Sequence, residues 1–202
     1  MKDPRKILIA TKNRGKLREI QTELAELPWE FICLADLKPL TEAQEIHDNF
    51  RENADLKALH YSNLTGLWTL ADDSGLEVDA LGGAPGVLSA RYAGADGDDA
   101  RNNAKLLAEL ADVPDEKRTA RFHCCLSLAD DDKILARSEG VIEGRIAWTE
   151  QGKNGFGYDP LFYVPEYGCT TAQMTAKQKN AISHRGQAMR AMKRIMLTEK
   201  LL

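Results

Sequence analysis

The sequence lacks long hydrophobic runs. Near its start only Ile7 to Ala10 is continuously apolar, which is too short for a membrane span or for the core of a secretory signal. Internal repeats, linkers and low-complexity segments are lacking as well, and hydrophobic residues make up 43% of the 202 residues, which argues against disorder and fibrous architecture. We therefore expect a cytoplasmic protein with one domain spanning residues 1–202.

An excess of positive charge is also lacking. The 27 Lys and Arg residues are outnumbered by 31 Asp and Glu residues, and the formal net charge is −4. This balance argues against a nucleic acid polymer as the ligand, because proteins that bind one neutralise its phosphates with a basic surface. A small anionic ligand is still compatible with it, since a few Lys and Arg side chains can focus a positive potential in a cleft.

Cysteine is scarce, and its spacing forms no motif. No CxxC pair occurs among the four cysteines, which are Cys33, Cys124, Cys125 and Cys169. We expect buried free thiols rather than a redox or metal site. Cys124 and Cys125 should point to opposite faces of a strand, because successive side chains alternate.

The periodicity of apolar residues predicts an α/β protein with a mixed sheet. Strand-like runs alternate with amphipathic helices at first, and two long strand-like runs follow each other later, as in an antiparallel hairpin. The predicted strands are Lys6–Ala10, Trp29–Leu34, Trp68–Ala71, Thr119–Ala129, Ile134–Ile142 and Leu161–Val164. The predicted helices are Leu17–Leu27, Phe50–Tyr61, Asp98–Leu110, Thr175–Lys179 and a terminal helix from Ser183.

A polar turn is the first candidate site segment. It joins a predicted strand to a predicted helix and consists of Thr11, Lys12, Asn13, Arg14, Gly15 and Lys16. The free N–H groups and the dipole of a helix start can bind an anion, although the spacing is not that of a Walker loop. An Asn-capped surface helix with solvated lysines explains the segment equally well.

Acidic residues form the second candidate group. Asp72, Asp73 and Ser74 directly follow a predicted buried strand, where carboxylates are costly unless they meet a cation or hydrogen-bond donors. Magnesium suits them because it prefers oxygen ligands that it shares with substrate phosphates. Glu45 precedes the helix that carries Lys57, and its carboxylate can also reach a cation. The alternatives are a turn that uses Asp and Gly for its geometry, and a solvated polar helix face.

The third candidate group contains an aromatic ring and a forked donor. Phe156 can stack on a base, while Asp159 and Arg185 offer an acceptor and donors for the edges of that base. The neighbouring candidates are Gly157, Tyr158, Lys179 and His184. A Gly-rich turn and a Ser-capped helix start are the competing structural explanations.

Taken in order, these segments resemble the inosine triphosphatase family, also called the non-standard purine NTP pyrophosphatases. The resemblance spans nearly the whole chain and rests on several long motifs. They are Thr11–Lys16, Glu52–Ala54 with Lys57, Leu70–Leu76, Gly82–Gly86 with Ser89–Tyr92, Gly155–Pro160 and Ala181–Gly186. The resemblance implies an α/β fold with an elongated mixed β-sheet flanked by helices, with two lobes around a nucleotide-binding cleft, in a homodimer.

The resemblance also implies roles for individual residues. Glu45 and Asp73 would bind Mg2+, and Asp73 would be the proton acceptor. Thr11–Lys16 and Lys57 would hold the triphosphate. The other substrate-binding positions would be Ser74, Phe156, Gly157, Tyr158, Asp159, Lys179, His184 and Arg185. The implied reaction is hydrolysis of inosine, deoxyinosine or xanthosine triphosphate to the monophosphate and pyrophosphate, by attack of water on the α phosphorus.

The chain departs from the family pattern at two places, and two other functions stay open. Ile46–Phe50 replaces a Thr-Gly-x-Thr-Phe run, so the loop with Glu45 can sit differently, and Asn154 stands where a second Gly is common. A pyrophosphatase for pyrimidine or methylated nucleotides would not need Phe156 and the pair His184 and Arg185. A non-catalytic nucleotide sensor should lose the acids.

Overall fold

The computed structural model describes residues 5–94, 97–199 and 201. Residues 1–4, which open the N-terminal segment considered above, lie outside the described residues. The strands are β1 (Arg5–Ile9), β2 (Trp29–Cys33), β3 (Trp68–Val78), β4 (Thr119–Asp130), β5 (Lys133–Ile146), β6 (Phe162–Val164) and β7 (Cys169–Thr170). The α-helices are α1 (Arg14–Leu24), α2 (Phe50–Thr65), α3 (Asp99–Glu109), α4 (Ala176–Ile182) and α5 (His184–Thr198). No helix among the described residues is long and apolar enough to cross a membrane.

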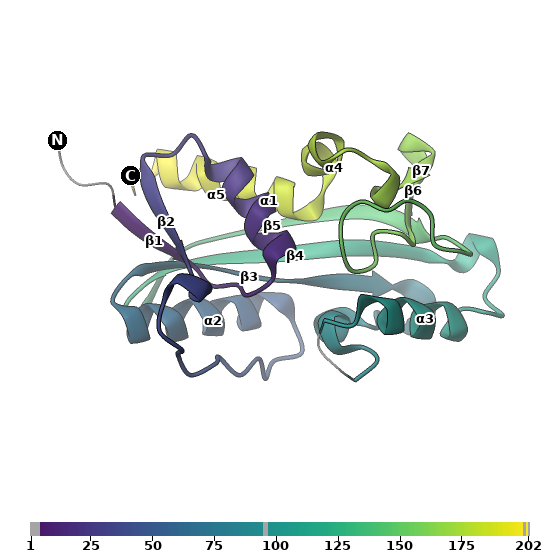
Figure 1. Ribbon diagram of the computed structural model, residues 1–202, viewed down its shortest axis with the longest axis horizontal. Helices are drawn as coiled ribbons and strands as arrows, with labels where there is room; N and C mark the ends of the chain where they lie inside the picture. The colour runs from purple at the N-terminus through teal and green to yellow at the C-terminus, as the bar shows by residue number, and fades with distance from the viewer. Residues whose placement is uncertain (1–4, 95–96, 200, 202) are drawn as a thin grey trace. The chain divides into compact units, whose positions relative to one another are not determined.

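The strands form one mixed sheet, as predicted. Its seven strands follow the order β2-β1-β3-β4-β5-β6-β7 (Figure 1). Strand β1 runs parallel to both β2 and β3, with Ile7 opposite Phe31 on one side and Trp68 on the other. Strand β6 is antiparallel to β5 and to β7. The α/β class with a mixed sheet is therefore confirmed.

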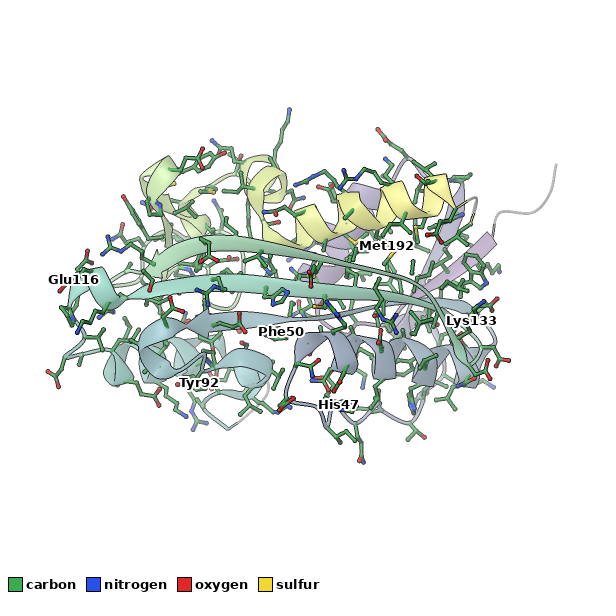
Figure 2. All side chains as sticks on the ribbon, turned by 180° about the vertical axis from the view of Figure 1, so that it is seen from behind. His47, Phe50, Tyr92, Glu116, Lys133 and Met192 are labelled. Atoms are coloured by element: carbon green, nitrogen blue, oxygen red, sulfur yellow. The ribbon has the colours of Figure 1, made fainter. Side chains whose placement is uncertain are left out.

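The chain divides into two compact units. The first comprises Met1–Asp73, Cys124–Gly140 and Arg185–Leu202. Within it, α2 lies on one side of the strands, and α1 and α5 lie on the other (Figure 1). The alternation of β1 serves both sides, because Ile7 and Ile9 join one buried cluster while Leu8 and Ala10 join another. Met192 of α5 belongs to the cluster of Ile7 and Ile9 (Figure 2).

The second unit comprises Ser74–His123 and Val141–His184. Its core joins Leu76 and Val78 of β3 to Leu106 of α3 and Phe162 of β6. Helix α3 covers one side of its strands, and α4 lies on the other (Figure 1). The prediction of one domain spanning 1–202 stays a prediction, and each unit is described by itself below.

The predicted end of the third strand was wrong. It was expected to end at Asp72 and Asp73, but β3 continues to Val78. The strand can continue because nearby cationic side chains compensate the two carboxylates. Further along the strand, Leu76 and Val78 are fully buried and supply the apolar face that a core strand needs.

The predicted hairpin is present, and its second strand is longer than expected. Strands β4 and β5 are neighbours in the sheet, and only Asp131 and Asp132 separate them. Asp131 has a φ of 54°, the left-handed conformation that tight turns require and that Asp tolerates. Figure 2 labels Lys133, the first residue of β5, beside this turn. Strand β5 runs to Ile146, whose side chain is buried, rather than ending at Ile142.

Arg118 should be a main stabilising residue of the second unit. Its guanidinium is buried and donates hydrogen bonds to the backbone carbonyls of Leu110, Ile146 and Ala147. Because Arg118→Met would leave these carbonyls without their donor, we expect the free energy of unfolding to fall by about 3 kcal/mol. Urea unfolding of the variant and the wild type measures the difference.

The matched control is Arg121→Met. Arg121 lies three positions further along β4, and its partners Asp79 and Glu143 are solvent-exposed carboxylates. Such a surface pair should contribute about 1 kcal/mol or less. Equal losses in the two variants would contradict the structural role assigned to Arg118.

Candidate active site

Asp72 is a buried carboxylate surrounded by cations. Its side chain is inaccessible to solvent, and its Oδ2 accepts a hydrogen bond from Arg185 Nε at 2.9 Å and one from Cys124 Sγ at 3.1 Å. Its Oδ1 pairs with Lys16. Burial alone would raise the pKa of Asp72, but Arg185 and Lys16 hold it well below its usual range. Asp72 is therefore ionised, and both of its carboxylate oxygens are used in contacts within the protein.

Asp73 points to the other face of β3 and has a different environment. Its Oδ1 lies 4.0 Å from Lys57 Nζ, and its Oδ2 is buried without a hydrogen-bond partner among the described residues. Burial raises the pKa of Asp73 to about 6, although Lys57 and Lys16 oppose the shift. At neutral pH the group is mostly ionised, yet it accepts a proton far more readily than an ordinary Asp.

Lys57 links Asp73 to the loop before α2. Its Nζ pairs with Glu45 and donates a hydrogen bond to the backbone carbonyl of Asp72 at 2.9 Å. Burial would lower the pKa of Lys57, but Asp73 and Glu45 raise it, so the ammonium stays charged. Glu45 lies outside the helix, as predicted, and two carboxylates and one ammonium come together here.

Asn53 holds the loop that carries Glu45. The buried amide accepts a hydrogen bond from the N–H of His47 and donates one to the carbonyl of His47, both at 3.0 Å. Asn49 caps α2 by accepting a hydrogen bond from the N–H of Glu52. These contacts anchor Ile46–Phe50, the segment whose sequence differs from the family pattern. The loop therefore still brings Glu45 to Lys57.

The turn Thr11–Lys16 forms the capped helix start that was considered as an alternative. Asn13 Oδ1 accepts hydrogen bonds from the N–H groups of Gly15 and Lys16 at 2.8 and 3.1 Å. These two amides are therefore occupied, and an anion here would be met mainly by side chains. Lys12 pairs with the exposed Glu42, and Lys16 reaches Asp72.

In the second unit, Asp159 organises the loop that carries Phe156. Its Oδ2 accepts hydrogen bonds from the N–H of Phe156 at 2.8 Å and from Lys179 Nζ at 2.6 Å, and its Oδ1 accepts one from Thr171 Oγ1 at 2.8 Å. Lys179 Nζ also lies 4.6 Å from the centre of the Phe156 ring. Asp159 and Lys179 thus fix the aromatic ring.

The remaining predicted positions of the second unit have separate surroundings. His184 is buried and stacks on Phe122, with ring centres 4.8 Å apart and an angle of 13° between the planes. The buried Tyr158 donates a hydrogen bond to the carbonyl of Ser89 at 2.8 Å. Ser74 follows Asp73 on β3 and is half-buried.

The structure brings several of the predicted residues together within their own units. The first unit joins Lys16, Asp72 and Arg185 on one face of β3, and Glu45, Lys57 and Asp73 on the other. The second unit joins Phe156, Asp159 and Lys179.

The sequence analysis missed several partners of the predicted residues, among them Glu19, Cys124 and Thr171. Glu19 pairs with Arg185, Cys124 donates to Asp72, and Thr171 donates to Asp159. Only Glu19 had a local signal, because it lies one turn after Lys16 on the same face of α1.

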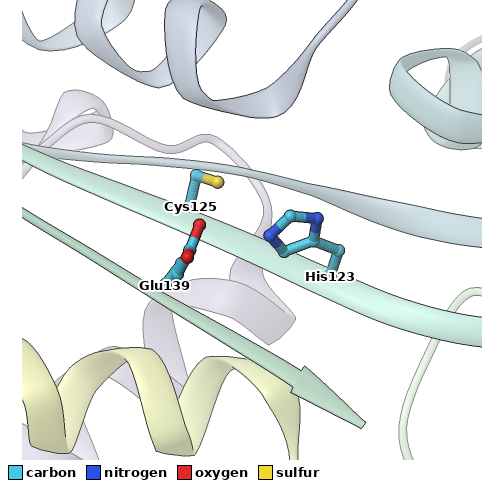
Figure 3. Close-up of side chains that lie close together, drawn as sticks. All are labelled: His123, Cys125 and Glu139. Atoms are coloured by element: carbon cyan, nitrogen blue, oxygen red, sulfur yellow. The ribbon is translucent and has the colours of Figure 1, made fainter. Parts of the chain in front are cut away.

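The cysteines are free, as expected. Cys33, Cys124 and Cys125 are buried, while Cys169 is half-buried. Figure 3 shows Cys125 and Glu139 on neighbouring strands, with His123 two residues before Cys125 on β4. Burial and the neighbouring Glu139 raise the pKa of the Cys125 thiol to about 12, so the thiol is protonated at neutral pH. Glu139 is also paired with Arg51 at 3.5 Å.

A comparison with known protein families identifies the family of this chain. The model of the Ham1 family matches residues 7–195. The chain belongs to the Ham1 family. This match confirms the resemblance drawn from the motifs, and it covers both compact units.

Other Ham1 relatives match over nearly their full length. A dITP/XTP pyrophosphatase of Exiguobacterium sibiricum is 48% identical over 96% of this chain and 98% of its own. One of Listeria monocytogenes is 49% identical over 94% of this chain and 93% of its own. The structure of a HAM1 protein from Coxiella burnetii is 44% identical, has a TM-score of 0.87 and covers 96% of this chain and 99% of that chain.

The ion pair of Arg185 and Asp72 should be a coupled stabilising unit. Because Arg185→Met would strip a buried carboxylate of one of its two cationic partners, we expect it to lower the free energy of unfolding by about 3–5 kcal/mol. Adding Asp72→Asn should recover part of this loss, since the charge that lacked a partner is then gone. Urea unfolding of both single variants and the double variant measures the coupling.

Arg190→Met on the same helix is the control. Arg190 pairs with Glu23 at 3.6 Å and its side chain is 42% exposed, so its loss should cost about 1 kcal/mol or less. Strictly additive effects of Arg185→Met and Asp72→Asn would show that the pair is not coupled.

Proposed function

We propose that this chain hydrolyses non-standard purine nucleoside triphosphates, namely those of inosine, deoxyinosine and xanthosine, to the monophosphate and pyrophosphate. Membership of the Ham1 family and the relatives named dITP/XTP pyrophosphatase support the activity, at 48% and 49% identity over 96% and 94% of the chain. The observation that carries the chemistry is Asp73, a buried carboxylate with a pKa of about 6 and a free Oδ2 within the described part of the chain.

Asp73 is the proposed proton acceptor. Its Oδ2 is not used by any described donor, and its raised pKa suits a general base near neutral pH. Asp73 would orient a water molecule and take a proton from it as the water oxygen bonds to the α phosphorus. The bond between that phosphorus and the bridging oxygen breaks at the same time, and pyrophosphate leaves.

The carboxylates of Glu45 and Asp73 fit a magnesium ion. Both offer oxygen donors, which Mg2+ prefers, and Lys57 lies between them as the cation that now compensates their charge. When bound, Mg2+ would neutralise charge on the triphosphate.

The other substrate contacts follow the sequence prediction. The side chains of Thr11–Lys16 and of Lys57 would bind the triphosphate, while Phe156 would stack on the purine. Arg185 is held by Asp72 and Glu19, which makes it a rigid donor for the 6-oxo group of the base. The remaining positions proposed to contact the substrate are Ser74, Gly157, Tyr158, Asp159, Lys179 and His184.

A homodimer and a cytoplasmic location, both expected from the sequence, complete the proposal. A nucleotide-pool enzyme would find its substrate in the cytoplasm. Light scattering coupled to size-exclusion chromatography measures the mass in solution. A mass near 22.4 kDa, that of one chain, would contradict the dimer.

A panel of nucleoside triphosphates tests the function. Each is incubated with the protein and magnesium, and pyrophosphate is separated from orthophosphate. We expect inosine and xanthosine triphosphates to yield the monophosphate and pyrophosphate at least ~10²-fold faster than ATP. A preference for pyrimidine or methylated nucleotides would favour the related pyrophosphatase, and binding without turnover would favour the nucleotide sensor.

Asp73→Asn should remove the chemistry while preserving the fold, because it deletes one negative charge at nearly constant volume. We expect kcat for inosine triphosphate to fall by ~10²-fold or more, the usual scale for a positioned base. Asp79→Asn, directly after the end of β3, is the control and should leave kcat unchanged. If Asp73→Asn kept more than about a tenth of wild-type kcat at saturating magnesium, another group would be the proton acceptor.

A further inference from the structure

Helix α3 holds both backbone polar groups of Gly157, its N–H and its carbonyl. The Oδ2 of Asp99 accepts a hydrogen bond from the N–H of Gly157 at 2.6 Å. The Nδ2 of Asn103 donates a hydrogen bond to the carbonyl of Gly157 at 3.2 Å. Asp99 and Asn103 are four positions apart on α3 and therefore share a face of the helix. None of these contacts was expected from the sequence.

Asn103 is placed at an energetic cost. Its side chain is 3% exposed, and its Oδ1 is buried without a hydrogen-bond partner among the described residues. An amide with one unsatisfied oxygen is a poor choice for stability, because that oxygen loses its hydration without compensation. A leucine of similar size would avoid this cost. The hydrogen bond to Gly157 is thus the feature that an amide provides and an apolar side chain does not.

Gly157 lies at the centre of the loop that presents Phe156. Its φ of 61° lies in the left-handed region, which glycine enters without steric cost. The residue before it carries the ring fixed by Asp159 and Lys179, and the residue after it, Tyr158, is anchored to the carbonyl of Ser89. Gly157 lies between these two anchors, and α3 binds its backbone N–H and carbonyl.

We propose that Asp99 and Asn103 are positioning residues, which fix the backbone N–H and carbonyl of Gly157 and so orient Phe156 for stacking on the purine. This inference rests on the proposed function, because it takes Phe156 as the residue that stacks on the base. It adds α3 to the elements that set substrate affinity. Neither residue needs to touch the substrate to do so.

Asn103→Leu separates positioning from stability. It removes the donor to Gly157 together with the unsatisfied oxygen. Because Gly157 is only half-buried, water can replace the lost donor, so the urea midpoint of unfolding should stay close to that of the wild type. The KM for inosine triphosphate should increase by ~10-fold while kcat changes little, since ground-state and transition-state binding of the base weaken together. A merely structural residue would show the opposite pattern, with a lower midpoint and an unchanged KM.

Two further variants test the other half of the contact. Asp99→Asn keeps an oxygen acceptor for the N–H of Gly157 and should retain a KM near that of the wild type, whereas Asp99→Ala should raise it. Asn102→Ala is the matched control, because Asn102 is also buried on α3 but bonds to the backbone of Ser89, Ala90 and Ala93 and not to Gly157. It should lower the urea midpoint and leave KM unchanged.

Binding and hydrogen exchange give readouts that do not need turnover. In calorimetry, Asn103→Leu should lower the affinity for inosine monophosphate. The affinity for inorganic triphosphate, which lacks a base, should stay unchanged. By mass spectrometry, backbone amides of residues 155–159 should exchange faster in Asn103→Leu than in the wild type.

The outcomes distinguish the two proposals. If the wild type cleaves no inosine triphosphate, the proposed function fails, while exchange at residues 155–159 still tests the contact with α3. If the wild type is active and Asn103→Leu has wild-type KM, the positioning role is overturned, whether or not exchange is faster. If Asn103→Leu lowered the affinities for inosine monophosphate and inorganic triphosphate equally, the positioning role would also be overturned.

Discussion

The first unit depends on the burial of one negative charge. The side chain of Asp72 is inaccessible to solvent, and a carboxylate is tolerated inside a sheet only when cations and donors meet it. Lys16 approaches from α1 and Arg185 from α5, so a single carboxylate ties both helices to β3. This compensation explains how a strand can carry an acid at its centre and still continue. It also explains why two helices far apart in the sequence cover the same side of the strands.

Because successive side chains of β3 point to opposite faces, the neighbouring Asp73 has a different environment and a pKa shifted in the opposite direction. Asp73 faces α2, where Lys57 approaches it less closely, and burial raises its pKa to about 6. The pKa of Asp72 lies well below its usual range. Two adjacent carboxylates whose pKa values are pushed apart can serve different purposes, one in structure and one in proton transfer.

In the second unit, the charged residues Asp159 and Lys179 likewise hold other side chains in place. Asp159 uses both carboxylate oxygens for donors within the protein, and Lys179 holds both Asp159 and the Phe156 ring. A loop organised in this way loses little conformational freedom when a ligand binds. Residues that a motif marks as substrate contacts can therefore act largely by fixing the side chains around them.

The sequence alone determined the α/β class, the mixed sheet, the family and the acids of β3, because apolar periodicity and contiguous motifs are local. It did not determine that β3 continues through Asp73, since that depends on compensation of Asp72 by Arg185, 113 positions away. Nor did it show the pKa of about 6 at Asp73, which is set by burial and by neighbours from other elements. In the sequence, Asn103 is one of several polar residues of a predicted helix, and nothing sets it apart. Only the tertiary structure, which packs α3 against the loop of Gly157, gave it a partner, because strand order and helix packing decide which distant residues meet.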